Sequence, residues 1–305
     1  MALVECIPNF SEGRRHDVIE AIVSAIQSSG VDILDVNTDP DHNRSVVTFS
    51  GTPDIVEQGA FLGIAEAKRL INLDNHVGVH PRIGAADVVP FVPLRDMSMS
   101  ECVVMAHRLG ERVARELNIP VYFYEYAAKI PIRRNLAEVR RHQYEQLKHT
   151  IQTDPTRTPD IGEPILSGAG AVAISARDPL VAFNAYLNTD NVTIAKAIAQ
   201  KVRESGGGLP YLKVLGLLVK GKAQVSMNIT DFRKISLHTV LEAVRQEAQK
   251  HGVIVTHTEL VGLIPQSAII QSALAYLGLP PETASRILET RIGDVTGDYR
   301  EIVFE

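Results

Sequence analysis

The segment V-D-I-L-D-V-N-T-D-P-D-H-N-R-S-V-V-T-F, residues 31–49, decides the fold that the sequence predicts. Both ends, residues 31–36 and 45–49, are rich in the β-branched residues that favour strands. The stretch between them, residues 37–44, contains Asp, Asn and Pro, a composition typical of turns. The segment therefore predicts two paired strands joined by a polar loop at the rim of a sheet.

Predicted helices flank this strand pair on both sides. Residues 15–28 and 54–73 carry apolar residues at the spacing of one buried helix face. A strand-like run, residues 3–8, precedes the first helix, and another, residues 87–93, follows the second. The prolines in the latter run predict an edge strand or a strand end. The order strand, helix, strand, strand, helix, strand predicts an antiparallel sheet covered on one face by two helices, the ferredoxin-like arrangement.

The second half of the chain predicts the same order again. A helix, a strand and a charged helix extend the first half over residues 100–149, with the charged helix at residues 133–149. Residues 152–170 are rich in Thr, Pro, Asp, Gly and Ser and predict a linker or loop. After it we expect strands at 171–176 and 181–187, a helix at 193–204, a hairpin at 212–229, a helix at 237–250, a strand at 253–260 and two C-terminal helices.

Together the two halves predict an α+β protein. We expect two tandem ferredoxin-like (βαββαβ) subdomains, with antiparallel sheets, helices on the outer faces and a groove between the sheets. The expected boundary gives an N-terminal subdomain of residues 1–176 and a C-terminal subdomain of residues 177–305. The length agrees with two units, because a single apolar core seldom grows beyond about 250–300 residues.

Composition and charge exclude several classes of protein. The formal charge is −5 and the pI is near 6.1, whereas a nucleic-acid binder usually has a basic face. No run of about 18 apolar residues predicts a membrane span, and the N-terminus lacks the pattern of a signal peptide. The two cysteines, Cys6 and Cys102, are too few for a four-cysteine zinc site. One disulfide is an alternative, but two buried thiols in a reducing cytoplasm is the simpler interpretation. We therefore expect a cytoplasmic protein that binds neither nucleic acid nor membrane.

The densest polar cluster, N-H-V-G-V-H-P-R-I-G-A-A-D-V, spans residues 75–88. His80 precedes Pro81, which disfavours the helical region and predicts an extended or turn segment at His80. A rigid loop position suits a side chain that reaches into a cleft, so His80 is a candidate acid–base residue. The alternative is a loop histidine that only satisfies local hydrogen bonds. A metal site with His76 and Asp87 is a further alternative, but Pro81 opposes the helix that would align the two imidazoles, and we expect no metal.

The loop of residues 35–46 offers more polar groups at the rim of the sheet. Asn43 and Arg44 are candidates to hold a substrate carboxylate, because guanidinium binds carboxylate bidentately. The alternative is a solvated hairpin loop. The glycines at residues 206–208 lack the G-x-x-x-x-G-K-[ST] pattern of a phosphate-binding loop, and no G-x-S-x-G nucleophile motif occurs.

Seven segments, in order along nearly the whole chain, resemble a known family: the formiminotransferase domain of glutamate formiminotransferase, which in animals belongs to formiminotransferase-cyclodeaminase. Seven ordered matches are far more specific than any single motif above. The segments are L-V-E-C-I-P-N-F-S-E-G at 3–13, N-R-S-V-V-T-F at 43–49, H-P-R-I-G-A-A-D-V-V-P-F at 80–91, P-V-Y-F-Y at 120–124, A-R-D-P-L-V-A-F-N at 176–184, A-Q-V-S-M-N at 223–228 and E-L-V-G-L-I-P at 259–265.

The resemblance implies a folate-dependent enzyme. It implies a homodimer of two-subdomain chains that moves a formimino group from N-formimino-L-glutamate to tetrahydrofolate, the co-substrate. The products would be 5-formimidoyltetrahydrofolate and L-glutamate, in histidine degradation. The family's catalytic histidine falls on His80, and the candidates for substrate binding are Asn37, Asn43, Arg44 and Arg82. The family's folate-binding stretch falls on the predicted linker, at Gly162, Glu163, Pro164, Ile165, Leu166, Ser167, Gly168, Ala169 and Gly170.

The sequence departs from the family pattern in three places. Val79 stands where the animal enzyme has a glutamate, Asn37 replaces an aspartate, and the folate-binding stretch is shorter and lacks the family's tryptophan. Other donors therefore stay open: formiminoglycine, N-formylglutamate or 5-formyltetrahydrofolate. A folate-binding protein without catalysis is the alternative from a different class. No cyclodeaminase half follows within the 305 residues, so we expect that second activity to be absent.

Overall fold

Residues 31–49 form the strand pair that the sequence predicts. In the computed structural model, which describes residues 1–297 and 299, β3 (Asp32–Asp39) and β4 (Arg44–Gly51) pair antiparallel. Both strands extend further into the polar stretch than predicted, so the connection between them shortens to residues 40–43. The polar side chains of this segment therefore lie on strand ends and a tight turn rather than on a long loop.

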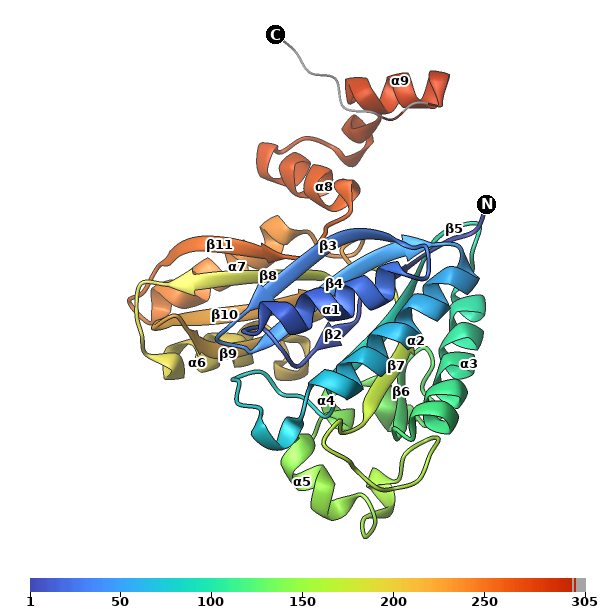
Figure 1. Cartoon of the computed structure of the whole chain (residues 1–305). Coiled ribbons are helices and arrows are strands. Elements are labelled where there is room, and N and C mark those ends of the chain that lie inside the picture. The colour runs from blue at the N-terminus through green and yellow to red at the C-terminus, as the bar shows by residue number, and fades with distance from the viewer. Residues whose placement is uncertain (298, 300–305) are drawn as a thin grey trace. The chain divides into compact units, whose positions relative to one another are not determined.

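The first of two compact units, Met1–Asp178, is built on a ferredoxin-like core. β1 and β2 are two parts of one strand, because both pair antiparallel with β4 on one side and with β5 on the other. Helices α1 and α2 pack on one face of this sheet, as predicted (Figure 1). The elements are β1 (Leu3–Cys6), β2 (Asn9–Phe10), α1 (His16–Gln27), β3, β4, α2 (Pro53–Leu70) and β5 (Ala86–Arg95).

Strand β5 lies inside the sheet, which corrects the edge position predicted from its prolines. It pairs with β1 and β2 on one side and with β7 (Val172–Ala176) on the other. In this register Pro90 falls opposite Ile7, where the neighbouring strand is interrupted between β1 and β2. Ile7 N–H donates to Pro90 O at 3.2 Å. Because the ladder is already irregular at this point, a proline without an N–H group is tolerated in an interior strand.

Two parallel strands and a third helix widen the first sheet. β6 (Val121–Glu125) pairs parallel with β7, and β7 pairs parallel with β5, so the sheet is mixed beyond its antiparallel core. Helix α3 (Met99–Leu117) connects β5 to β6 and begins at a capping box. The predicted order of elements counts residues 171–176 as the first strand of the second βαββαβ repeat, but β7 completes the sheet of the first unit. Its fully buried apolar run suits a strand with neighbours on both sides.

The sequence predicts a linker or a loop over residues 152–170, and the structure shows a loop within the first unit. Ile161 forms an isolated bridge with Val121, and Gly170 forms one with Gly84. Val121 N–H donates to Ile161 O at 2.9 Å. Backbone hydrogen bonds to neighbouring strands therefore hold this stretch, and it needs no apolar periodicity.

The charged helix predicted over residues 133–149 is divided into short pieces. His142 has a φ of 77°, in the left-handed region that interrupts a helix. Arg140 lies at this break. The pieces are a 3₁₀ turn (Pro131–Arg134), α4 (Leu136–Val139) and α5 (Gln143–Thr150), and further 3₁₀ turns lie at Leu73–Asn75, Pro155–Arg157, Glu204–Gly206 and Pro281–Arg286.

The second unit, Pro179–Glu305, contains the second predicted βαββαβ order. Its sheet is antiparallel, with the strand order β11-β8-β10-β9. Helices α6 and α7 bury their apolar faces in the core of this sheet, and the predicted C-terminal helices follow. The last residues of the predicted C-terminal subdomain, 298 and 300–305, lie outside the described residues. The elements are β8 (Val181–Leu187), α6 (Val192–Val202), β9 (Leu212–Val219), β10 (Lys222–Ile229), α7 (Leu237–Lys250), β11 (Val255–Val261), α8 (Gln266–Leu277) and α9 (Leu288–Thr296).

Each unit has its own apolar core. Between the first sheet and its helices lie the fully buried rings of Phe10, Phe49, Phe91 and Phe123. Burying one such side chain stabilises the fold by roughly 1.5–3 kcal/mol. A smaller cluster around Tyr122 covers the opposite face of β5, β6 and β7. Apolar side chains therefore pack on both faces of β5, β6 and β7.

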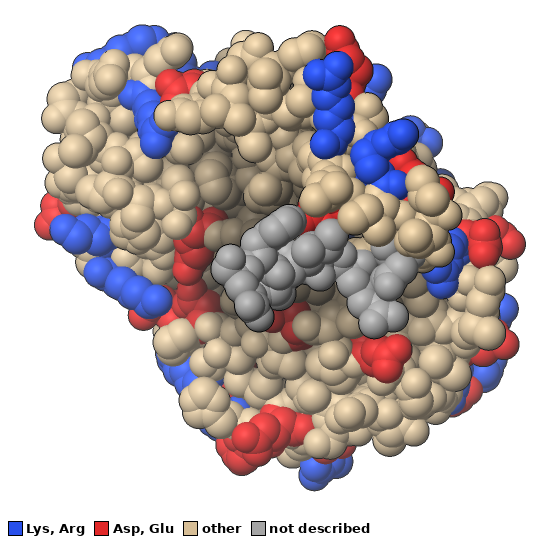
Figure 2. All heavy atoms as spheres, turned by 90° about the horizontal axis from the view of Figure 1, so that it is seen from above, with Lys and Arg blue, Asp and Glu red and all other residues tan. Residues whose placement is uncertain are grey.

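Figure 2 shows one face, on which the basic side chains are scattered and several lie beside acidic ones, without a continuous basic patch. Among residues 1–297 and 299, no helix combines the length and apolar character needed to cross a bilayer. Cys6 and Cys102 are both buried and free.

Candidate active site

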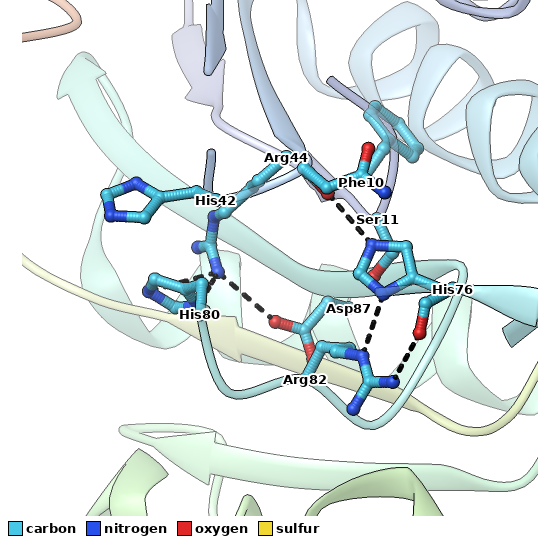
Figure 3. Close-up of a pocket in the computed structure, with 9 residues that line it drawn as sticks. Phe10, Ser11, His42, Arg44, His76, His80, Arg82 and Asp87 are labelled. Carbon is cyan, nitrogen blue, oxygen red and sulfur yellow. Dashed lines mark hydrogen bonds and ion pairs between the residues drawn. The ribbon is translucent and has the colours of Figure 1, made fainter. Parts of the chain in front are cut away.

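A pocket opens in the first unit between the β3–β4 turn, the segment after α2 and the start of β5 (Figure 3). The space in this pocket, including the part that is open to solvent, is about 180 Å³, so the pocket is small. The pocket therefore has room for a reacting group rather than for a large molecule. Its wall is mostly polar and consists of Phe10, Ser11, His42, Asn43, Arg44, His76, His80, Arg82 and Asp87.

Close backbone contacts hold residues 76–82 against the β3–β4 turn. A Cβ atom at Gly78 would lie 2.2 Å from His42 O, so only glycine fits at this position. Asn43 has a φ of 48°, and its side-chain amide donates to Val77 O at 3.1 Å. The segment is thus fixed to the turn just before the histidine that the sequence singles out.

His80 lies in the pocket with its ring against the guanidinium group of Arg44 (Figure 3). Arg44 Nη1 is 2.7 Å from His80 Nδ1 and 3.3 Å from His80 Nε2, and His80 Nδ1 is 2.8 Å from Pro81 O. A guanidinium group only donates hydrogen bonds, so the imidazole must accept from Arg44. With the proton on Nε2, Nδ1 accepts from Arg44 at 2.7 Å; with the proton on Nδ1, that N–H donates to Pro81 O and Nε2 accepts from Arg44 at 3.3 Å. Both arrangements require a neutral imidazole.

The surroundings of His80 favour the same protonation state. Burial lowers the pKa of His80 well below its usual range, and the charges of Arg44 and Arg140 lower this pKa further. His80 is therefore neutral at physiological pH and able to accept a proton. Burial, followed by repulsion from Arg140, lowers the pKa of Arg44 to about 9, which leaves Arg44 charged at neutral pH.

Asp87 connects the basic residues to the histidine segment. Its carboxylate is buried, and Oδ1 accepts from Ile83 N–H at 2.9 Å. Its other oxygen, Oδ2, lies 3.5 Å from Arg44 Nη1 and forms an ion pair with Arg140. Asn9 holds the far side of Arg44, whose Nε donates to Asn9 Oδ1 at 3.0 Å. One carboxylate therefore orients two guanidinium groups and the loop that carries the histidine.

Arg82 is committed to contacts within the first unit. Its Nε donates to His76 Nδ1 at 3.0 Å, and its Nη2 donates to His76 O at 3.2 Å. Both terminal nitrogens bind Glu145, at 2.9 and 2.5 Å, and Nη1 also donates to Gln143 Oε1 at 3.3 Å. These contacts occupy all five N–H donors of a guanidinium group. In this conformation Arg82 positions the neighbouring loops and has no donor left for a ligand.

The arginines Arg44, Arg82 and Arg140 outnumber the two carboxylates with which they form ion pairs. Arg82 pairs with Glu145, whereas Arg44 and Arg140 share the single carboxylate of Asp87. With His80 neutral, these residues leave one positive charge uncompensated. The excess charge favours an anionic group, and a planar guanidinium group suits a carboxylate.

The structure brings four of the predicted site residues together. His80, Arg44, Asn43 and Arg82 all line the pocket. Asn37 does not line it and lies within β3, opposite Val46. The sequence predicts that the residues of the polar loop lie close together. In the structure, only the part of this loop next to β4 lines the pocket.

The predicted folate-binding stretch, residues 162–170, lies beside the histidine segment but not in the pocket wall. Gly84 and Gly170 form a bridge, and a Cβ atom at Gly170 would lie 2.2 Å from Ile83 O. The two backbones are therefore as close as glycine permits. The earlier part of the stretch is more exposed, with Ile165 60% accessible.

Sequence reasoning missed Asn9 and Arg140 as members of the site. The local sequence indicates a turn at Asn9 and a continuous charged helix around Arg140. Asp87 was a candidate only as a metal ligand, whereas in the structure it is the partner of Arg44 and Arg140. The resemblance included Asn9 in its first segment, but nothing in the local sequence distinguishes Arg140. Within residues 1–297 and 299, no three His, Cys, Asp or Glu side chains are grouped to hold a metal ion.

The lowered pKa of His80 predicts a pH-dependent stability. Below pH ~6.5 the unfolded chain protonates this histidine while the folded chain does not, so the unfolded state gains stability. We expect the free energy of unfolding to fall between pH 6.5 and pH 5, with His80 contributing up to ~1.4 kcal/mol per pH unit. In His80→Gln that contribution disappears, and urea unfolding at pH 7 and pH 5 measures the difference. Equal pH slopes in the two proteins would show that His80 titrates normally.

Comparisons with known proteins show the family of the chain. Residues 3–177 match the family model described as "Formiminotransferase domain, N-terminal subdomain", and residues 182–289 match "Formiminotransferase domain". The chain is 47% identical to "Glutamate formimidoyltransferase" of Thermoplasma acidophilum, covering 96% of this chain and 98% of that protein. It is 44% identical to "Glutamate formimidoyltransferase" of Streptococcus pyogenes serotype M1, covering 90% and 93%. It is 41% identical to "Formimidoyltransferase-cyclodeaminase" of Rattus norvegicus, covering 95% of this chain and 56% of that protein. The chain therefore belongs to the formiminotransferase family.

Proposed function

We propose that this protein is a glutamate formimidoyltransferase. It transfers the formimino group of N-formimino-L-glutamate to N5 of tetrahydrofolate, giving 5-formimidoyltetrahydrofolate and L-glutamate. The observation that carries the proposal is the neutral imidazole of His80, held against the charged Arg44 in a polar pocket of a formiminotransferase chain. The names of the Thermoplasma and Streptococcus relatives support this donor, and the reaction belongs to histidine degradation.

The proposed mechanism is proton transfer by His80 during addition and elimination. N5 of tetrahydrofolate attacks the formimino carbon and forms a new C–N bond, and neutral His80 takes the proton that N5 loses. His80 then gives this proton to the departing nitrogen as the bond between the carbon and the glutamate nitrogen breaks. A positioned histidine of this kind contributes typically ~10²–10⁴-fold to the rate. The protonated amidine carbon is itself electrophilic, so the chemistry requires no metal.

Arg44 is the better of the two arginine candidates for the substrate carboxylate. The contacts of Arg82 with His76, Gln143 and Glu145 use all five of its N–H donors. The contacts of Arg44 with Asn9, His80 and Asp87 use four, so Arg44 keeps one N–H for a carboxylate. A carboxylate on Arg44 would balance the excess positive charge. Asn43 borders the same pocket and is proposed as a neighbouring contact.

Tetrahydrofolate is the proposed co-substrate, and residues 162–170 are its proposed binding stretch. Support comes from the family resemblance and from the bridge between Gly84 and Gly170, which fixes one end of the stretch beside the His80 segment. We also propose that the enzyme works as a homodimer in the cytoplasm. The family resemblance supports the dimer, and the two free buried thiols fit a reducing compartment.

A comparison of donors tests the proposed function. Purified protein and tetrahydrofolate are mixed with formiminoglutamate, formiminoglycine or N-formylglutamate, and absorbance follows 5-formimidoyltetrahydrofolate from the two formimino donors and 5-formyltetrahydrofolate from the formyl donor. As the fourth donor, 5-formyltetrahydrofolate is mixed with L-glutamate, and the release of tetrahydrofolate and N-formylglutamate is measured. We expect the highest kcat/KM with formiminoglutamate. A higher value with another donor would reassign the substrate. Tight tetrahydrofolate binding without turnover of any donor would favour a folate-binding protein.

A further inference from the structure

Helix α5 contacts both halves of the proposed site within the first unit. One half is the segment of residues 72–85, which carries His80 in its middle, and the other is the proposed folate-binding stretch, residues 162–170. We call residues 72–85 the loop segment. Two neighbouring residues in the first turn of α5, Tyr144 and Glu145, form hydrogen bonds to different parts of it.

Backbone hydrogen bonds join the folate-binding stretch to both ends of the loop segment. Leu73 N–H donates to Gly168 O at 2.7 Å, and Ala85 N–H donates to Ala169 O at 2.8 Å. A Cβ atom at Gly168 would lie 2.4 Å from Asn72 Oδ1, so only glycine permits this close approach. The stretch and the loop segment therefore share a border along which neither can shift independently.

Tyr144 lies at this border. Its ring is buried in the core of the first unit. Its hydroxyl group donates to Asp74 Oδ1 at 2.7 Å and lies 3.4 Å from Ser167 O. Lys148, one turn further along α5, binds the same oxygen of Asp74 at 2.6 Å. The hydroxyl group of Tyr144 therefore holds the start of the loop segment against the folate-binding stretch.

Glu145 holds the part of the loop segment around His80. Its two carboxylate oxygens accept from both terminal nitrogens of Arg82, at 2.9 and 2.5 Å. Arg82 in turn donates to His76 Nδ1 and to His76 O, so its side chain connects residues on the two sides of His80 (Figure 3). An exposed carboxylate thus fixes a buried guanidinium group that closes the loop on which His80 lies.

We propose that Tyr144 and Glu145 are positioning residues with separate tasks. Tyr144 holds the folate-binding stretch in the conformation that binds tetrahydrofolate, and Glu145, through Arg82, holds His80 at the reacting atoms. Neither residue lines the pocket. The inference rests on the proposed function and adds to it the residues that preorganise the two halves of the site.

The two tasks have different consequences for the reaction. A stretch that is already in its bound conformation loses less conformational entropy when the ligand binds, so the hydrogen bond of Tyr144 contributes to affinity for tetrahydrofolate. A catalytic group must lie close to its productive position, and a misplacement of about 1 Å can cost ~10²-fold in rate. The ion pair between Glu145 and Arg82 therefore contributes to kcat.

Tyr144→Phe removes the hydroxyl group and keeps the ring in the core. We expect the Kd for tetrahydrofolate to rise ~3–10-fold, the effect of one hydrogen bond, while kcat with saturating substrates stays within about twofold of the wild-type value. Calorimetric titration under anaerobic conditions measures Kd, and steady-state kinetics measures kcat. Tyr122→Phe is the matched control, because its ring is also buried in the first unit and its hydroxyl group donates to Arg157 O, outside the folate-binding stretch.

Glu145→Gln removes the charge that holds Arg82 and keeps the size of the side chain. We expect kcat to fall ~10-fold with an unchanged Kd for tetrahydrofolate, because His80 shifts relative to the reacting nitrogens. Glu138→Gln is the matched control, because it breaks the ion pair of Glu138 with Arg141 in the same unit, outside the loop segment.

A second measurement on Glu145→Gln does not depend on turnover. Burial is the main cause of the lowered pKa of His80, so a loosened loop segment should raise that pKa towards its usual range. An NMR titration of the histidine rings measures the shift, and the signal of His80 is assigned by its absence in His80→Gln. Tyr144→Phe should leave the pKa of His80 at its wild-type value.

The division between the two variants separates positioning from general damage. Wild-type affinity for tetrahydrofolate in Tyr144→Phe, or an equal loss of affinity in Tyr122→Phe, would overturn the role of Tyr144. A wild-type kcat together with an unshifted pKa of His80 in Glu145→Gln would overturn the role of Glu145. A change of both Kd and kcat in each variant would contradict the separate tasks.

The outcomes also distinguish this inference from the proposed function. Turnover of formiminoglutamate by the wild-type protein supports the proposed function even if both variants behave as the wild type does. If the wild-type protein turns over no donor, the proposed function fails. Weaker tetrahydrofolate binding in Tyr144→Phe and a raised pKa of His80 in Glu145→Gln would still support the two positioning roles.

Discussion

His80→Ala lowers kcat by ~10²–10⁴-fold if His80 transfers the proton between the two nitrogens. The substitution removes the acceptor that faces Arg44 but leaves the predicted folate-binding stretch untouched. We therefore expect the KM for tetrahydrofolate to change little while kcat falls. Steady-state kinetics with saturating tetrahydrofolate and formiminoglutamate measures both quantities.

A second histidine provides the control for this substitution. His149 is exposed near the end of α5 and does not line the pocket, so His149→Ala should keep the wild-type kcat. Circular dichroism of both variants checks that they fold. A kcat near the wild-type value in His80→Ala would remove this histidine from the chemistry, whatever the effect on KM.

Asp87→Asn destabilises the first unit by about 3–5 kcal/mol, the cost of breaking a buried ion pair from one side. The new amide can still accept from Ile83 N–H, so the loop geometry survives. The loss is electrostatic, because Arg44 and Arg140 then face each other without a shared counter-charge. Urea unfolding monitored by circular dichroism measures the change in the free energy of unfolding.

The same change at an exposed aspartate is the comparison for Asp87→Asn. Asp96 forms an ion pair with the N-terminal ammonium group at 3.1 Å on the surface, and Asp96→Asn should cost no more than ~1 kcal/mol. If both substitutions cost the same, Asp87 would not act as a buried partner of the two arginines. Activity of Asp87→Asn at a temperature where it is folded should also fall, because Arg44 loses the carboxylate that orients it.

The order of elements was predictable from the sequence, whereas strand neighbours were not. Apolar periodicity and turn residues predict both βαββαβ orders, because local patterns determine which face of each element is buried. The position of β5 depends on β7, which joins it from residues 172–176, more than 75 positions later in the chain. The prolines of β5 indicate an edge, and only the break between β1 and β2 explains why an interior place is tolerated.

The candidate site was predictable where local sequence restricts the backbone. Pro81 and Gly78 mark a rigid loop around His80, and the structure places His80 in a pocket. Arg140 could not be predicted, because it reaches Asp87 from a break that the sequence shows as a continuous charged helix. Such contacts join segments that are distant in the sequence, so local periodicity does not predict them.

The central claim is transfer of the formimino group to folate, and the stoichiometry of the products tests it most directly. Formiminoglutamate is incubated with the wild-type enzyme, with and without tetrahydrofolate, and L-glutamate and 5-formimidoyltetrahydrofolate are both quantified. The account predicts equal amounts of the two products when tetrahydrofolate is present and no glutamate release without it. Release of glutamate at the same rate without tetrahydrofolate would contradict it, because water rather than folate would then be the acceptor.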